Sequence, residues 1–314
     1  MRFVLGLLLL ASAARPGMAA AACVTGEAVF KTVTPQVTHF HDYEIRAYHQ
    51  PDCAAEPESR IAGIEILKGG NRVYLETGYS FALGYPLDQD QPPDSVKPTV
   101  GMDLTGKGPG LLISEWSGGA HCCYSFHIFQ LGAAFKALPV IPLLDADESA
   151  LVRRPGIKGL VLSTVDYSDF RYFPQDFAGS PAGRVFLSFD GVRFSPNLSL
   201  MRANPPAPGE TGKCAALFKA SRDWKEQKGP PQPLGMWYYA TDLVYTGNEA
   251  DAWAFLDRAW GGKAADKKRY LDEYRSRLGK SIYRRELMQL HKTPLTALGQ
   301  KIDWTQHCFD YLRG

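Results

Sequence analysis

Two kinds of hydrophobic pattern divide the chain. From about residue 24 to 200, short apolar runs alternate with Gly, Pro, Asn and Asp, and no stretch keeps a helical period. Such runs, bounded by turn residues, are typical of β-strands. After about residue 213, apolar positions recur at helical spacing. We therefore predict an α+β protein, with a β-rich domain over residues 23–201 and an α-helical domain over residues 213–314.

The boundary between the two patterns is a Pro- and Gly-rich stretch, RANPPAPGETG, at residues 202–212. This composition is typical of a linker. Helices are expected after it over residues 214–227, 235–245, 249–260 and 266 to about 290. The middle two resemble a tetratricopeptide-like hairpin with Gly247 and Asn248 at its turn. The last carries an apolar stripe of Leu271, Tyr274, Leu278, Ile282 and Leu287.

The β-rich region contains segments that look like copies of one another. PGLLISEWS (109–117) and KGLVLSTVD (158–166) each follow a Gly-containing turn, and each is followed by a second strand, a turn and a further strand. A fainter version is IEILKGGNRVYLE (64–76). A recurrence of about 50 to 60 residues is typical of blade-like or hairpin units that bury their faces by stacking.

A loop before the first of these copies resembles a known repeat. DLTGKGPGLLISEW (103–116) is similar to the start of an FG-GAP or VCBS-type propeller repeat, in which acidic loop residues bind calcium. Asp103 matches the first ligand, whereas Thr105 and Lys107 replace further acidic or amide ligands. A lysine ammonium has no lone pair to give to calcium. The resemblance therefore implies propeller-blade-like or sandwich repeats with a degenerate calcium loop.

The first 22 residues predict export. They contain one early basic residue, an apolar run from Phe3 to about Ala14, and small residues that offer Ala-x-Ala cleavage sites, as in a secretory signal peptide. The run is shorter than the roughly 20 residues of a membrane-spanning helix. We expect a periplasmic or secreted protein without a transmembrane segment. A net charge of only +2 gives no field that would concentrate nucleic acid.

An even number of cysteines in an exported chain favours disulfides. The cysteines are Cys23, Cys53, Cys122, Cys123, Cys214 and Cys308. Their positions favour a Cys23–Cys53 pair around the first strand region and a Cys214–Cys308 pair around the C-terminal third, which leaves Cys122 with Cys123. Closing the long C-terminal loop would stabilise the fold by roughly 4 to 5 kcal/mol in the chain-entropy model.

The stretch EWSGGAHCCYSFHIF (115–129) holds the densest candidate chemistry. If residues 121–128 form a strand, alternation places His121, Cys123 and His127 on one face, where imidazole and thiolate ligands suit zinc or copper. Two further imidazoles share a face if their segment is extended, namely His39 and His41. We favour a vicinal Cys122–Cys123 disulfide, because exported thiols are usually oxidised. A third alternative is that both cysteines bond elsewhere or stay buried.

Other residues suggest acid–base chemistry or ligand contact, although no complete catalytic signature is present. Glu115, Asp166 and Asp169 would supply paired carboxylates for glycan hydrolysis if the copied strands stack. The loop DYSDFRYFPQDFAGSP (166–181) is rich in aromatic residues, which stack on sugars or peptides. The resulting candidate ligand surface consists of Trp116, Tyr167, Phe170 and Tyr172.

The chain as a whole resembles uncharacterised bacterial exported proteins that carry an SGGAHCC signature with FG-GAP-like units. This resemblance implies a bacterial envelope location and no particular reaction. We expect a binding or scaffolding protein that contacts another protein or a glycan and needs no cofactor. The alternatives are a copper- or zinc-binding periplasmic protein and a carboxylate-dependent hydrolase acting on glycans.

Overall fold

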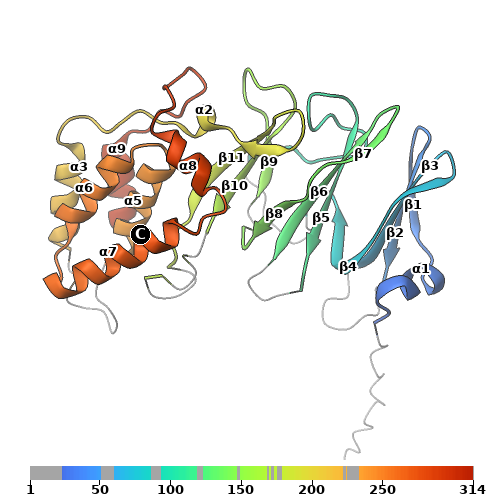
Figure 1. Ribbon diagram of the computed structural model, residues 1–314, viewed down its shortest axis with the longest axis horizontal. Coiled ribbons are helices and arrows are strands. Elements are labelled where there is room, and N and C mark those ends of the chain that lie inside the picture. Colours follow the sequence, from blue (N-terminus) through green and yellow to red (C-terminus); the bar gives the residue numbers. More distant parts are fainter. Residues whose placement is uncertain are drawn as a thin grey trace, which may run out of the picture.

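The fold is known from a computed structural model. It describes residues 23–50, 60–85, 93–118, 123–146, 149–167, 170, 173–174, 179–221, 224 and 233–313. Figure 1 shows helices at one end of the molecule, a small sheet in the middle and a large sheet at the other end. The predicted α+β class, with antiparallel sheets before helices, is confirmed. No helix among the described residues is long and apolar enough to cross a membrane. The predicted signal peptide lies outside these residues.

Among the described residues the large sheet has eight strands, seven of which follow chain order. These are β1 (Gln36–Phe40), β2 (Tyr43–His49), β3 (Ile61–Lys68), β4 (Asn71–Leu83), β5 (Gly110–Trp116), β6 (Tyr124–Leu131) and β7 (Phe135–Ala137). The eighth, β8 (Ile141–Leu144), pairs with β6 beside β7. Two helical turns precede the sheet, η1 (Gly26–Ala28) and α1 (Val29–Thr32). All pairings are antiparallel, as the hairpin pattern of the sequence predicts.

The large sheet curls over its own inner face. Its longest strand, β4, pairs with β3 mainly along its first part and with β5 along its last part. Tyr74 on the first part contacts the ring of Phe129 on β6, with centroids 4.7 Å apart. The Tyr43 hydroxyl on β2 donates to the carbonyl of Gly132 beyond β6, at 2.8 Å. The curl encloses a core that includes Ile45, Ile64, Ile66, Phe81, Leu111 and Ile113.

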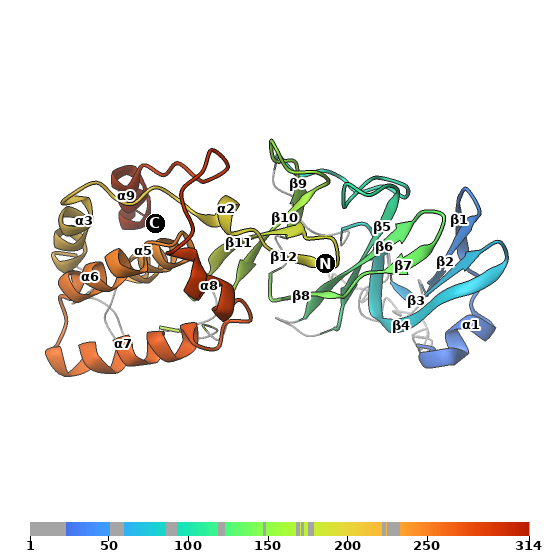
Figure 2. The ribbon, with the colours of Figure 1, turned by 45° about the horizontal axis from the view of Figure 1, so that its top comes forward.

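The small sheet has the strand order β12-β11-β10-β9. Its strands are β9 (Ala150–Val152), β10 (Val161–Asp166), β11 (Gly183–Phe189) and β12 (Phe194–Pro196). All six residues of β10 are buried, because the sheet is covered on both faces. It lies between the large sheet and the helices in both views (Figures 1 and 2).

The two copied segments occupy equivalent positions in the two sheets. β5, β6 and β7 recur as β10, β11 and β12, and the loops before β5 and β10 pack backbone against backbone. The Leu160 N–H donates to the Leu104 carbonyl at 2.9 Å. A Cβ at Gly159 would lie 2.4 Å from the backbone carbon of Thr105, so only glycine fits there.

The other described helices follow the small sheet. They are α2 (Leu198–Met201), α3 (Glu210–Lys219), α5 (Leu234–Tyr245), α6 (Glu249–Ala259), α7 (Ala264–Leu278), α8 (Arg284–Leu290) and α9 (Trp304–Arg313). The predicted hairpin is formed by α5 and α6, with the expected turn at Gly247 and Asn248. Its small packing residues, such as Ala240 and Ala252, are fully buried.

The prediction of one continuous helix from residue 266 to about 290 is wrong, because the structure has two helices there. The chain leaves the helix after Leu278, passes through a turn and starts α8 at Arg284. The predicted apolar stripe is therefore interrupted: Tyr274 and Leu287 are buried, but Ile282 lies in the turn and is 50% exposed. Gly279, which has low helix propensity, stands at the break.

One hydrophobic core joins the small sheet, the helices and the outer face of the large sheet. Its members include Leu112, Phe126, Leu162, Val185, Trp237, Leu243, Phe255 and Trp304. The Pro- and Gly-rich segment 202–212 starts within this body: Ala203 is fully buried, and the Asn204 side chain bonds to the backbone of Ile302 at both its N–H and carbonyl. The division of the chain into domains at this segment stays a prediction.

The predicted Cys214–Cys308 disulfide is confirmed, with the Cα atoms 6.0 Å apart. It connects α3 to α9, and both sulfur-bearing residues are buried. The disulfide therefore covalently links the first long helix of the helical part, α3, to its last, α9.

Candidate functional site

The predicted calcium loop is closed by its own backbone. Oδ1 of Asp103 accepts N–H bonds from Thr105 at 3.1 Å, Gly106 at 2.7 Å and Lys107 at 3.2 Å. This carboxylate therefore stabilises the tight turn before β5. The described residues contain no group of three or more His, Cys, Asp or Glu side chains that could hold a metal ion.

The signature loop between β5 and β6 is closed by two hydrogen bonds. The Ser117 N–H donates to the Cys123 carbonyl at 3.0 Å, and the Cys123 N–H donates to Ser117 Oγ at 2.7 Å. Strand β6 begins at Tyr124, so Cys123 precedes the strand instead of lying within it. The other two residues of the HCC sequence (121–123), His121 and Cys122, lie outside the described residues.

Disulfide bonding removes one thiolate from the predicted set of metal ligands. Cys23 and Cys123 are both disulfide-bonded. The proposed partner Cys53 lies outside the described residues, as does Cys122, so these two pairings stay predictions. A disulfide sulfur is not a thiolate, so Cys123 offers no thiolate to the predicted set with His121 and His127. His41, at φ 52° in the β1–β2 turn, does not extend the strand that contains His39.

A polar cluster occupies the inner face of the large sheet at the base of this hairpin. Glu115 pairs with Ser125 in the β5–β6 register. Nε2 of His127 lies 2.9 Å from Glu115 Oε2, and the Ser125 hydroxyl donates to the same oxygen at 3.0 Å. The Tyr74 hydroxyl lies 3.4 Å from His127 Nδ1. We call Tyr74, Glu115, Ser125 and His127 the sheet cluster; only 9% of the His127 side chain is exposed.

The hydrogen bonds of the sheet cluster define its chemistry. A carboxylate only accepts hydrogen bonds, so Nε2 of His127 carries the proton in its contact with Glu115. This bond lowers the pKa of Glu115; burial opposes the shift, and the Ser125 bond adds to it. A protonated Nε2 does not deprotonate Ser125, whereas in a catalytic triad the serine and the carboxylate contact opposite ring nitrogens. The cluster therefore connects β4, β5 and β6, and its protonated Nε2 is not arranged to activate Ser125.

The second predicted carboxylate, Asp166, has a different environment. It is buried at the end of β10, where Oδ2 accepts bonds from the Tyr245 hydroxyl at 2.7 Å and the Ser281 hydroxyl at 2.5 Å. Glu115 bonds instead to side chains of β6, so the two predicted carboxylates are engaged by separate partners. Asp169 lies outside the described residues. The bond to Ser281 makes Asp166 an anchor for the turn between α7 and α8.

The predicted ligand surface was Trp116, Tyr167, Phe170 and Tyr172. Trp116 is half-buried, and the exposed ring of Tyr79 packs edge-on against it at 5.2 Å. Phe170 is fully buried and stacks on Tyr274 of α7 at 5.1 Å, so it belongs to the core and not to a surface. Tyr167 packs against the same core, and Tyr172 lies outside the described residues.

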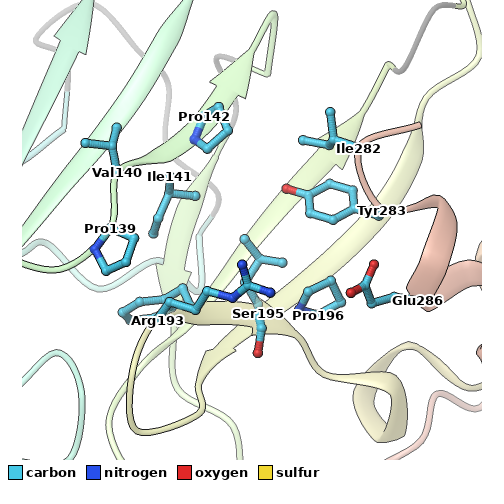
Figure 3. Close-up of a pocket in the computed structure, with 12 residues that line it drawn as sticks. Pro139, Val140, Ile141, Pro142, Arg193, Ser195, Pro196, Ile282, Tyr283 and Glu286 are labelled. Atoms are coloured by element: carbon cyan, nitrogen blue, oxygen red, sulfur yellow. The ribbon is translucent and has the colours of Figure 1, made fainter. Parts of the chain in front are cut away.

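A groove of 210 Å³ opens where both sheets and the helices meet. We call it the β8–β12 groove. Figure 3 shows one side formed by Pro139, Val140, Ile141 and Pro142, the other by Ile282, Tyr283 and Glu286, and Arg193, Ser195 and Pro196 between them. Val140 and Ile282 are each 50% exposed, although both are large apolar residues. Apolar side chains exposed together around a concave surface are typical of an interaction site.

The strands beside the groove are edge strands. Within the part of the chain that the structure describes, β8 pairs with β6 alone and β12 pairs with β11 alone. An edge strand leaves backbone polar groups without a strand partner. Pro142 in β8 and Pro196 in β12 have no N–H, so these edges are poor templates for unrestricted sheet extension. Carbonyl acceptors and apolar side chains are what the groove offers to an extended chain.

The groove carries two opposite charges: Arg193 lies between its two sides, and Glu286 lies on one of them. Neither Arg193 nor Glu286 forms an ion pair with another described residue, so both charges are available to a partner. Burial raises the pKa of the Tyr283 hydroxyl, with smaller contributions from nearby carboxylates. This phenol therefore stays protonated near neutral pH and can donate a hydrogen bond.

Two hydrogen bonds hold the turn between α7 and α8 in place beside the groove. Ser281 bonds to Asp166, and the Tyr283 N–H donates to Ser281 Oγ at 3.0 Å. The backbone on both sides of Ile282 is thereby held, and its side chain projects outward. The Asp166 carboxylate, predicted as a catalytic group, instead positions one side of the β8–β12 groove.

Sequence reasoning missed this groove, although two signals for it exist. The run LPVIPLL at residues 138–144 places prolines within a strand-like pattern, which indicates an exposed edge. The other is Ile282, which follows a glycine in a helical pattern. Comparison of the chain with family models, with curated proteins and with solved structures finds no match to any of them.

Proposed function

We propose that this protein is an exported binding protein that holds an extended peptide segment of another envelope protein in the β8–β12 groove. The observation that carries the proposal is the pair of half-exposed apolar residues, Val140 and Ile282, on opposite sides of a groove bordered by two edge strands. A peptide with an apolar centre, an acidic residue toward Arg193 and a basic residue toward Glu286 matches this surface in shape and charge.

Export is supported by features of two kinds. The first 22 residues have the composition of a secretory leader. The Cys214–Cys308 disulfide is of the type that persists in oxidising compartments such as the bacterial periplasm or the cell exterior. A protein that works there meets segments of other envelope proteins in extended form, which is the form that the groove accepts.

The two alternative functions have less support. A zinc or copper site with His121, Cys123 and His127 would need another ligand in place of the disulfide-bonded Cys123. A hydrolase using Glu115 and Asp166 would need both carboxylates at one substrate, but each is bonded to its own partners.

A glycan is also a weaker choice of partner than a peptide. An aromatic cavity of 420 Å³ between Trp224 and Trp260 is where a sugar would stack. These two indoles are only 8% and 7% exposed, and their N–H groups bond to the carbonyls of Phe218 and Lys263. Little ring face therefore remains for a sugar.

Selection from a random dodecapeptide library displayed on phage tests the proposal. The purified chain is the target, and selected peptides are synthesised and measured by fluorescence polarisation against the wild type. We expect enriched peptides with an apolar centre. Val140→Glu and Ile282→Glu, which place a charge in the groove, should each weaken their binding by about tenfold or more.

Val37→Glu is the matched control, because Val37 is also exposed, at 41%, but lies on β1 away from the groove. It should leave the affinity of the selected peptides unchanged. Thermal unfolding of all three variants checks that each is folded. If no peptide is enriched, or if the enriched peptides bind the groove variants as well as they bind Val37→Glu, the proposal is wrong.

A further inference from the structure

A second cavity lies on the other side of the small sheet and shares no residue with the β8–β12 groove. It has a volume of 240 Å³ and lies between β10 and β11, helices α5 and α9, and the segment before α9. Its apolar part comes from Val165, Ala182 and Ile302, and its charged part from Arg184, Asp242 and His307. Sites for drug-sized ligands measure about 300 to 1,000 Å³, so this cavity suits a smaller molecule.

One carboxylate is the centre of the polar side of this cavity. Oδ2 of Asp242 on α5 lies 2.7 Å from His307 Nε2 and 2.5 Å from the Tyr311 hydroxyl, both on α9. His307 and Tyr311 are one helical turn apart, so they reach the same oxygen from the same helix face. Burial, and then the Asp242 charge, raise the pKa of Tyr311, which therefore remains a donor. We call these three residues the helix cluster.

Both contacts of the helix cluster use the same oxygen of Asp242. The other oxygen, Oδ1, accepts no bond from the residues that the structure describes. The Asp242 side chain is 18% exposed, and that of His307 is 28% exposed, so a small molecule in the cavity can reach them. Asp242 is thus oriented by two donors and retains one acceptor oxygen.

A cation lies in the same cavity without neutralising this carboxylate. Arg184 on β11 donates to the Ser163 hydroxyl at 3.1 Å, and it forms no ion pair with Asp242 or another described carboxylate. A guanidinium has five N–H donors, so most of those of Arg184 remain for a ligand. One small cavity therefore presents a separate cation and a separate anion.

We propose that this cavity binds a small free α-amino acid as its zwitterion. The carboxylate of the ligand would bond to Arg184, as guanidinium groups match carboxylates in geometry. The ammonium of the ligand would donate to Oδ1 of Asp242, and its side chain would contact Val165, Ala182 and Ile302. A simple anion would leave Asp242 unused, and a simple amine would leave Arg184 unused.

Isothermal titration calorimetry on the purified chain tests this proposal, with glycine, L-alanine, L-leucine and L-glutamate as probes. Two analogues of alanine separate its charges: propionate has no ammonium, and ethylamine has no carboxylate. We expect at least one amino acid to bind. If alanine binds, each of its analogues should bind about tenfold or more weakly than alanine, because a charge-assisted hydrogen bond is lost.

Two variants assign the charges to residues. Arg184→Gln should weaken the binding of amino acids and of propionate, whereas Asp242→Asn should weaken amino acids by about tenfold and leave propionate unchanged. Glu27→Gln, at an exposed carboxylate on η1 that lines neither this cavity nor the groove, is the control and should bind amino acids like the wild type. If Asp242→Asn fails to fold, the analogue series on the wild type still decides. Equal affinity for alanine and propionate, or no heat with any of the four amino acids, would overturn the proposal.

Discussion

The sheet cluster and the helix cluster share three chemical groups, and the sheet cluster also contains the Ser125 hydroxyl. Each has a carboxylate, an imidazole and a phenol. In the sheet cluster the imidazole is central, with one neighbour at each ring nitrogen. In the helix cluster the carboxylate is central, with both neighbours on one of its oxygens. In both clusters one carboxylate oxygen accepts two bonds, so the difference lies in the imidazole. Both ring nitrogens of His127 have a side-chain neighbour, whereas among the described residues only Nε2 of His307 has one.

The surroundings of the two clusters agree with this difference. His127 is 9% exposed and is enclosed by strands of one sheet, whereas His307 is 28% exposed and lines a cavity. A closed cluster adds to stability, and an open one is available for binding. Residue type alone therefore does not distinguish a structural polar cluster from a candidate ligand site.

The largest expected effect comes from the disulfide that holds one of the clusters in place. Cys308 is next to His307 on α9, so the double variant Cys214→Ala, Cys308→Ala should loosen the helix cluster. Opening a link between residues 94 apart in sequence should lower the free energy of unfolding by about 4 to 5 kcal/mol. Urea unfolding measures this change, and hydrogen exchange should increase in α9 much more than in β5 and β6. Equal increases in both regions would mean that the clusters belong to one cooperative unit.

A smaller effect should come from removing each imidazole. His127→Ala deprives the partly buried Glu115 of its main donor, and we expect a loss of about 2 kcal/mol in the free energy of unfolding. His307→Ala should cost less than about 1 kcal/mol, because the His307 imidazole is more exposed than that of His127, at 28% against 9%. Urea unfolding of both variants at neutral pH compares them directly. A larger cost for His307→Ala would reverse the assignment of the closed and open clusters.

The smallest expected effect is the pH dependence of the contribution of Glu115 to stability. The pKa of Glu115 is lower in the folded chain than its ordinary value of 4.5, so folding favours the ionised form. Its contribution to stability is present above that ordinary value and is lost as the pH falls through the lower folded pKa. The stability difference between the wild type and Glu115→Gln, about 1 kcal/mol or less, should be greatest near neutral pH and disappear in acid.

Thermal unfolding across a pH series measures this difference, with Glu27→Gln as the control variant. Glu27 is an exposed carboxylate on η1, outside the sheet cluster. Its replacement should give the same pH profile as the wild type. If the Glu115→Gln difference grew as the pH fell, the sign of the linkage would be wrong.

Local patterns predicted the fold class well because they depend on neighbouring residues. Alternating short apolar runs gave the strands, and the small residues Ala240 and Ala252 indicated the α5–α6 hairpin. The interruption of the last long helix was missed, because a buried partner of Ser281 fixes it, and that partner, Asp166, is 115 residues away. Tertiary contacts of this kind leave no periodic signal.

The candidate sites were harder to predict for the same reason. Alternation places Ser125 and His127 on one face, but only the register of β5 with β6 brings Glu115 to them. Helix α9 was not among the predicted helices, so the spacing of His307 and Tyr311, four residues apart, was not interpreted. Asp242 is 65 residues from His307, and no local pattern connects them.

The disulfide between α3 and α9 also has a consequence for biogenesis. No other cysteine lies between Cys214 and Cys308. In a chain that emerges from its N-terminus, Cys308 is the next free thiol for Cys214 if the four earlier cysteines have already paired with one another. Direct oxidation then yields the native pair without rearrangement of a wrong one. Production of the helical part should accordingly require a thiol oxidase but little help from a disulfide isomerase.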